Sequence, residues 1–267
     1  MTTKPVASLG MRTFGLVAEY DGTNFTGSQL QASSRTVQGA IEDALQLILG
    51  VHTRARLASR TDSGVHAFGQ VIAFEAVTRL SSESLRNALN FHLPADVKVR
   101  CAQQLPDRFD PRRRARSREY VYTINDAPSA PALHRHTEVH VKHRLDVHAM
   151  DEAARALVGT HDFAAFAGPA TPKGAVTVRR MDFASVERID ERIRVTVRGN
   201  AFLHQQVRRM GAALVDAGRG KLSRHSIETM LASSARSPRS RILGPEGLCL
   251  TRVAYEGAGE CGLPESE

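Results

Sequence analysis

The order in which strand-like and helix-like segments follow one another constrains the fold of this chain most. Helices are predicted where apolar residues recur every three or four positions, and strands where short runs alternate or are β-branched. Up to residue 104 the predicted order is strand, helix, strand, strand, helix, strand, over residues 13–20, 36–49, 54–59, 70–74, 81–91 and 97–104. This βαββαβ order is typical of a two-layer α+β unit with an antiparallel sheet.

The remainder of the chain repeats this architecture without repeating the residues. Its predicted strands are residues 118–125, 134–142, 176–188, 192–198 and 248–255, and its predicted helices are residues 146–158, 201–217 and 223–233. We therefore expect an α+β fold of two RRM-like, or ferredoxin-like, βαββαβ domains. Their antiparallel sheets are expected to meet across a basic central cleft. The expected domains are residues 1–107 and 108–267.

Positive charge is concentrated in the second of these domains. Residues 1–107 hold ten Lys and Arg against nine Asp and Glu, whereas residues 108–267 hold 26 against 19. Six arginines fall within residues 108–118, and Tyr120 and Tyr122 follow directly. A solvated linker is the simpler interpretation of such a run. Arginine also clamps phosphates and stacks on bases, so an RNA-binding groove is the alternative.

One carboxylate, Asp62, lies in a short loop between two predicted strands. An Asp-Ser-Gly sequence is an ordinary turn former, because Asp accepts hydrogen bonds from its own backbone. The same carboxylate is a nucleophile or base if a cation such as Arg60 or Arg208 keeps it ionised. The triplet also occurs in aspartic proteases, but these need two such carboxylates sharing a proton, and this chain has one such triplet.

Other residue patterns argue against several classes of protein. His136 and His140 are four residues apart but lie in a strand-like context, so they do not share a helical face, and no metal site is expected. The cysteines Cys101, Cys249 and Cys261 form no CxxC pair, which fits a reduced, cytoplasmic protein. No apolar run approaches transmembrane length, and the first eleven residues do not resemble a signal peptide.

Several motifs together resemble the TruA-type tRNA pseudouridine synthases. The central one is Arg60-Thr61-Asp62-Ser63-Gly64-Val65-His66-Ala67, continued by Gly69-Gln70-Val71. The others follow in the same order, in residues 19–27, 36–38, 109–122, 159–163 and 200–208. The resemblance extends from Tyr20 to about Tyr255, which is nearly the whole chain.

The resemblance implies an isomerase that converts uridine to pseudouridine at tRNA positions 38–40, in the anticodon stem-loop. It implies a cytoplasmic homodimer that binds tRNA across both subunits and needs no cofactor or metal. Asp62 is then the essential carboxylate, which adds to the target nucleotide while the base–ribose bond breaks; the atom that it attacks is left open. Tyr120 lies against the uracil and handles the proton at C5, Arg208 keeps Asp62 ionised, and Arg60 helps to turn the nucleotide out of its stack. The implied RNA-binding residues are Tyr120, Arg112, Arg113, Arg114, Arg116, His204 and Gln205.

The chain departs from the family at three small residues. Ser59 stands where Gly is usual and Ser63 where Ala is usual, and we expect little effect from either. Ser28 stands where Trp is common, which affects packing or an RNA contact in the early loop. The competing hypothesis is an RNA-binding module without catalysis. Asp62 with Tyr120 and Arg208 discriminates the two, because a binder needs no carboxylate in a phosphate-lined cleft.

Overall fold

The computed structural model describes residues 10–233 and 241–265. The strands are β1 (Arg12–Tyr20), β2 (Arg56–Leu57), β3 (His66–Ala76), β4 (Val97–Leu105), β5 (Ser117–Asn125), β6 (Val139–His140), β7 (Gly159–Asp162), β8 (Val178–Ile189), β9 (Arg192–Gly199) and β10 (Leu248–Ala254). The helices are α1 (Val37–Leu49), α2 (Ser82–His92), α3 (Val147–Arg155), α4 (Gln206–Gly218) and α5 (Arg224–Ala232), with a short 3₁₀ turn at Ala164–Phe166. The predicted mixture of helices and strands is therefore confirmed.

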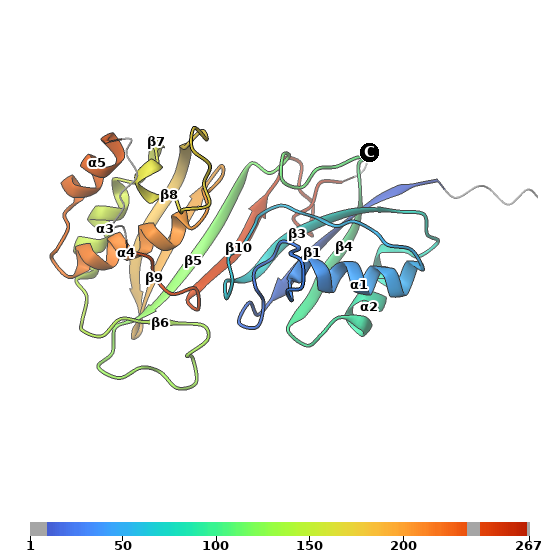
Figure 1. Ribbon diagram of the computed structural model, residues 1–267, viewed down its shortest axis with the longest axis horizontal. Coiled ribbons are helices and arrows are strands. Elements are labelled where there is room, and N and C mark those ends of the chain that lie inside the picture. Colours follow the sequence, from blue (N-terminus) through green and yellow to red (C-terminus); the bar gives the residue numbers. More distant parts are fainter. Residues whose placement is uncertain (1–9, 234–240, 266–267) are drawn as a thin grey trace, which may run out of the picture.

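Within the described residues, ten strands form one mixed sheet that runs through both halves of the chain. Eight strands follow the order β4-β1-β3-β10-β5-β9-β8-β7, while β2 pairs with β3 and β6 with β5. Strand β10 joins the halves: it pairs in parallel with β3 and antiparallel with β5 (Figure 1). The prediction of two separate antiparallel sheets is wrong at this point. A strand's own sequence pattern does not reveal its partner, and β10 satisfies the open edges of two strands far from it in sequence.

The helices gather at the two ends of this elongated molecule (Figure 1). Helix α1 contacts α2 in the first half, and α3 contacts α4 and α5 in the second. Thr36 and Ser81 cap α1 and α2, since their side chains accept hydrogen bonds from the backbone of Gly39 and Ser84. One continuous apolar core spans both halves, and its largest fully buried side chains include Phe14, Phe74, Tyr122, Phe163 and Phe166.

Helix α4 begins at Gln206, five residues later than its apolar periodicity predicts. Gln205 adopts a left-handed conformation, with φ of 58°, which a continuing right-handed helix does not allow. Residues 201–205 therefore form a loop. Because this loop is not helical, Phe202 and His204 reach the cavity described below.

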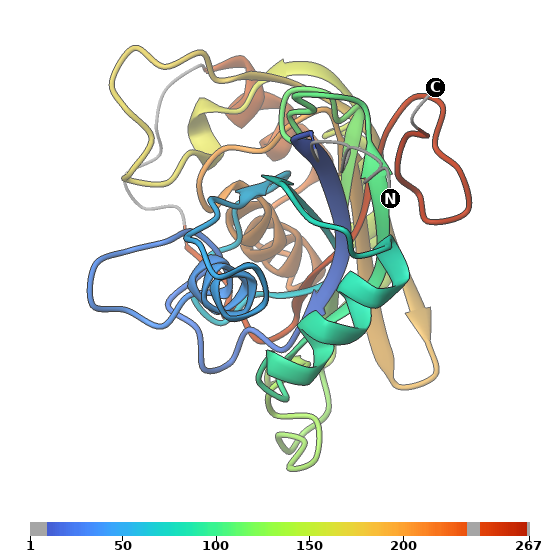
Figure 2. The same cartoon turned by 90° about the vertical axis from the view of Figure 1, so that its right-hand side faces the viewer.

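The C-terminal tail returns to the first half of the chain. Cys261 forms a disulfide with Cys101 of β4, and their Cα atoms are 6.0 Å apart. The Gln103 side chain donates a hydrogen bond to the carbonyl of Pro264 at 2.8 Å. In Figure 2 the tail lies on the other side of β1 from α1. The expectation of reduced cysteines is therefore wrong for Cys101 and Cys261. Their separation of 160 residues gave no spacing signal from which the disulfide could be predicted.

Neither a membrane-spanning helix nor a metal-binding cluster occurs in the part of the chain that the structure describes. Across residues 10–233 and 241–265, no helix has the length and apolar character needed to cross a membrane. The same residues contain no group of three or more His, Cys, Asp or Glu side chains arranged for a metal ion. His140 instead faces the carbonyl of Ala127 at 2.8 Å, and His134 lies 3.8 Å from Glu138.

Candidate active site

The loop that carries Asp62 is fixed by hydrogen bonds to buried side chains on both of its flanks. The amide of Gln70, which is fully buried in β3, pairs with both backbone groups of Ser59, at 3.1 and 2.8 Å. The hydroxyl of the fully buried Ser28 accepts a hydrogen bond from the amide of Thr61 at 2.8 Å. Tyr20 bonds the Thr61 hydroxyl at 2.8 Å. Because these partners are buried, the loop presents Asp62 in a fixed position.

His66 ties the end of the same loop to its surroundings. Its Nδ1 accepts a hydrogen bond from the Gly22 amide at 3.0 Å, so its Nε2 carries the proton in the neutral ring. That Nε2 donates to the carbonyl of His136 at 2.7 Å, in the second half of the chain. Gly22 itself has no room for a side chain, since a Cβ there would lie 2.0 Å from the Val65 carbonyl oxygen.

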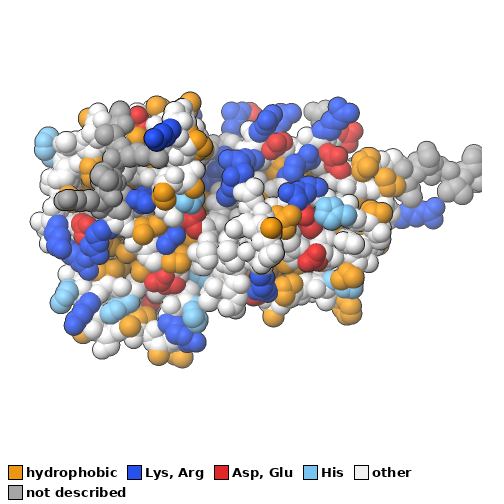
Figure 3. Space-filling model, viewed as in Figure 1, with side chains coloured by type: hydrophobic (Ala, Val, Ile, Leu, Met, Phe, Trp, Pro, Cys, Tyr) orange, Lys and Arg blue, Asp and Glu red, His pale blue; other side chains and the backbone are white. Residues whose placement is uncertain are grey.

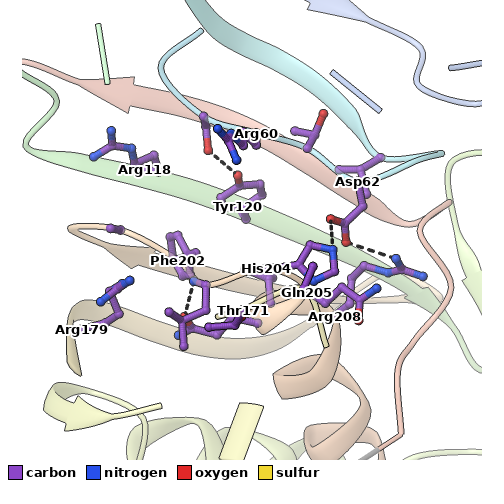
Figure 4. A pocket seen from close by; sticks show the side chains of 18 of the residues that line it. Arg60, Asp62, Arg118, Tyr120, Thr171, Arg179, Phe202, His204, Gln205 and Arg208 are labelled. Carbon is purple, nitrogen blue, oxygen red and sulfur yellow. Dashed lines mark hydrogen bonds and ion pairs between the residues drawn. The ribbon is translucent and has the colours of Figure 1, made fainter. Parts of the chain in front are cut away.

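Asp62 meets its cation across the two halves of the molecule. Arg208, in the first turn of α4, donates from Nη1 to Oδ2 of Asp62 at 3.2 Å. Its Nε donates to the carbonyl of Leu243 at 3.0 Å, which fixes the plane of the guanidinium. His204 Nε2 lies 3.8 Å from Oδ1 of Asp62 (Figure 4). The Asp62 side chain is 21% exposed and that of Arg208 is 14% exposed, so a carboxylate is held next to a cation and still reached by solvent.

Tyr120 forms the apolar wall beside this carboxylate. It is buried in β5, and its ring packs edge-on against Phe202 with centroids 5.2 Å apart. Its hydroxyl is hydrogen-bonded to the Ser59 hydroxyl at 2.8 Å. Burial raises the pKa of Tyr120 to about 12, against the lowering by Ser59 and Arg118. The phenol is therefore neutral at pH 7 and can donate a hydrogen bond.

These groups line one cavity of about 340 Å³ between the halves of the chain. Asp62 and Arg208 lie at one end, and Arg118 and Arg179 at the other (Figure 4). Lys and Arg side chains also gather on the surface near the middle of the molecule (Figure 3). A cavity of this size, with both apolar and polar walls and several cations, suits a small anionic group such as one nucleotide.

The structure brings together only some of the residues that the sequence nominated. Those that line the cavity are Arg60, Asp62, Arg112, Tyr120, His204, Gln205 and Arg208. The other nominated arginines, Arg113, Arg114 and Arg116, do not line it and are exposed. Arg113 lies 3.8 Å from Asp110, and Arg116 pairs with Glu256.

The sequence interpretation assigned no role to several lining residues, among them Arg118, Phe202 and Arg179. Arg118 is buried and donates to four backbone carbonyls, those of Ala58, Arg112, Ala115 and Asn200, so it joins the segments around the cavity. Its position two residues before Tyr120 on the same strand is a signal that could have identified it. Phe202 belongs to a motif already quoted. Arg179 carries no such signal, because only the fold brings β8 to the cavity.

Comparison with known proteins shows the family to which the chain belongs. The family model described as tRNA pseudouridine synthase matches residues 16–112 and 153–256. The tRNA pseudouridine synthase A of Geotalea uraniireducens is 38% identical over 92% of this chain and its own whole length. Those of Geobacter sulfurreducens and a Methylobacterium species are 39% and 40% identical, over 92% and 93% of this chain and all of theirs. The chain therefore belongs to the TruA-type tRNA pseudouridine synthases, a family of isomerases.

Proposed function

We propose that this isomerase converts uridine to pseudouridine at positions 38–40 of the tRNA anticodon stem-loop, with Asp62 as the essential carboxylate. The observation that carries the proposal is the Asp62–Arg208 pair inside a cavity that four further arginines also line. A carboxylate repels phosphate, so a protein that only bound RNA would gain nothing from it there. A reaction at a sugar or base gives it a purpose.

The reaction needs one bond broken, one bond formed and one proton moved. The N1–C1′ bond of uridine breaks while Asp62 adds to the nucleotide. The detached uracil rotates, and C5 bonds to C1′ as the Asp62 adduct is released. The proton on C5 is then lost and N1 gains a proton, so the product is an isomer of the substrate. No electron is transferred to or from another molecule.

Tyr120 and Arg208 assist this sequence in different ways. The guanidinium of Arg208 stabilises the charged form of Asp62 before attack and after release. Tyr120 lies against the uracil and takes the C5 proton as its own proton passes to the hydrogen-bonded Ser59 hydroxyl, which releases its proton to solvent water. One proton leaves in total, and both hydroxyls stay neutral. A phenol whose pKa is raised to about 12 is neutral at pH 7 and does not act alone as a base, so the C5 proton leaves by the relay through Ser59 to water.

The target uridine reaches this cavity by leaving its stack. Unstacking costs a few kcal/mol, and contacts with the surrounding stem and loop must offset that cost. Arg60 and the arginines after residue 108 supply such contacts in the proposal, and a cytoplasmic homodimer holds one tRNA across both subunits. Each half of the chain is then an RRM-like unit, joined to the other through β10.

The proposal is tested with synthetic anticodon stem-loops that carry C5-tritiated uridine at position 38, 39 or 40. We expect tritium release from each of these RNAs and none when the label lies in the stem remote from the loop. Binding of all RNAs without tritium release from any would support the competing hypothesis, an RNA-binding module.

A further inference from the structure

Besides Arg118, which donates to four backbone carbonyls, three arginines line the cavity without a carboxylate to neutralise them. Arg60 follows β2, Arg112 belongs to the arginine run, and Arg179 lies on β8. Among the described residues, none of the three has an acidic side chain within ion-pair distance, in contrast to Arg113 and Arg116 nearby. Their positive charges therefore remain available to a ligand.

The positive charge of Arg112 acts on both of the other arginines in this group. The pKa values of Arg60 and Arg179 are lowered, first by burial and then by the positive charge of Arg112. Arg60 and Arg179 are therefore both close enough to Arg112 for its charge to act on them, and each is partly removed from water. Such a group is unfavourable in the empty protein, and an anion between the guanidinium groups relieves the repulsion.

Arg179 is held in place by its own strand. Its Nη1 donates to the carbonyls of Val176 and Val178, at 2.9 and 2.7 Å, which fixes the side chain. Its Nε is buried and has no hydrogen-bond partner in the structure. A guanidinium fixed in this way loses little conformational entropy when it binds a phosphate. The next residue, Arg180, is exposed and pairs instead with Asp182 at 2.7 Å.

We propose that Arg60, Arg112 and Arg179 form a phosphate subsite that binds a phosphodiester flanking the uridine whose base and sugar lie against Tyr120 and Asp62. The cavity is continuous from Asp62 to Arg179, so one nucleotide can contact both ends. The phosphate is attached to the ribose away from C1′, where the base is attached. When the base and C1′ lie beside Asp62, the phosphate therefore lies toward the end of the cavity that holds Arg179. The subsite rests on the proposed function and assigns Arg179 a role in it.

The experiment is a double-mutant cycle between Arg179 and individual phosphates. The probe is an anticodon stem-loop in which one phosphate is replaced by a neutral methylphosphonate. The replacement lies on the 5′ side of the target uridine, on its 3′ side, or in the stem away from it. An otherwise identical RNA with all phosphates is the reference. Dissociation constants are measured for the wild type, Arg179→Ala and the matched control Arg180→Ala.

We expect Arg179→Ala to weaken binding of the reference RNA roughly tenfold or more, as for a hydrogen bond to a charged group. One flanking methylphosphonate should weaken wild-type binding by a similar factor and weaken Arg179→Ala binding little further. Arg180→Ala should behave as the wild type with every RNA. The subsite would be overturned if, at both flanking positions, the methylphosphonate weakened binding to Arg179→Ala by the same factor as it weakens binding to the wild type.

Two further measurements keep the result interpretable. If Arg179→Ala does not fold, Arg112→Ala, in an exposed turn, replaces it in the same cycle, with the same two outcomes. Because the cycle measures binding, it can support or overturn the subsite even if the wild type forms no pseudouridine. Absence of pseudouridine in the unmodified RNA would overturn the proposed function instead.

Discussion

Nη1 of Arg208 lies 3.2 Å from Oδ2 of Asp62, although the two residues are 146 positions apart in sequence. Asp62 follows a short strand of the first half, and Arg208 lies on a helix of the second. Their meeting requires both halves to be docked, which β10 achieves by pairing with β3 and β5. The candidate active site therefore depends on the continuity of the sheet.

The first prediction concerns Arg208. Replacing it by Ala leaves the half-buried Asp62 without its cation, and losing one partner of such a pair costs about 2–5 kcal/mol. A loss of transition-state stabilisation of this size lowers the rate of pseudouridine formation roughly 30- to 5,000-fold. Arg208→Lys keeps a charge but loses the bond to Leu243, so an intermediate rate is expected. Single-turnover kinetics measure both, and an Arg208→Ala rate equal to that of the wild type would contradict the pair's role.

The second prediction concerns Ser28, where the family commonly has Trp. Its hydroxyl is the acceptor for the Thr61 amide, and Ser28→Ala leaves that buried amide without a partner. The free energy of unfolding should fall by about 1–3 kcal/mol. The rate should also fall, because the loop that presents Asp62 loosens. Ser129→Ala, at an exposed serine, is the matched control, and urea melts of the two variants that superimpose would disprove the effect.

The third prediction concerns ionisation of the tyrosines. Burial raises the pKa of all four, Tyr20, Tyr120, Tyr122 and Tyr255, above the usual value of 10.0. The unfolded chain therefore releases these protons first as the pH rises. The stability that they contribute is fully present below pH 10 and is lost above it. Near-ultraviolet absorbance should show no phenolate in the native protein at pH 10 and about half ionisation in denaturant. The absence of Trp makes that signal easy to read.

The fourth prediction concerns the disulfide between Cys101 and Cys261. It ties the tail to the first half and does not line the cavity. Reduction should lower the free energy of unfolding by about 2–4 kcal/mol and leave the rate of pseudouridine formation unchanged. Cys101→Ser should behave as the reduced wild type and no longer respond to reductant. A change in rate on reduction would show that the tail influences the cavity.

The sequence predicted much of the local structure, because local structure follows local patterns. Helix α1 covers Val37–Leu49 between its N-cap Thr36 and the left-handed Gly50, in agreement with the predicted range 36–49. Apolar periodicity extended α4 too far, since the left-handed Gln205 breaks the helix without any Gly or Pro to signal it. The pairing of β10 with β3 was also beyond prediction, because strand partners depend on packing across the whole molecule.

At the candidate site, too, residues in local motifs were predicted and contacts distant in sequence were not. Asp62, Tyr120 and Arg208 came from motifs, and the structure brings all three to one cavity. The buried partners that hold the loop, such as Gln70, lie within the quoted motif but could not be assigned a contact from sequence. Arg179 was missed because nothing near it in the sequence marks it, and only the position of β8 beside the cavity does so.

The most direct test of the central claim is the rate of Asp62→Asn and Asp62→Ala on unmodified tRNA with C5-tritiated uridine. Both variants should still bind tRNA about as tightly as the wild type, because Asp62 contributes no attraction to phosphate. Tritium release should fall by more than ~10⁴-fold, as for the loss of a covalent nucleophile. Release from either variant at a rate comparable to that of the wild type would contradict the account.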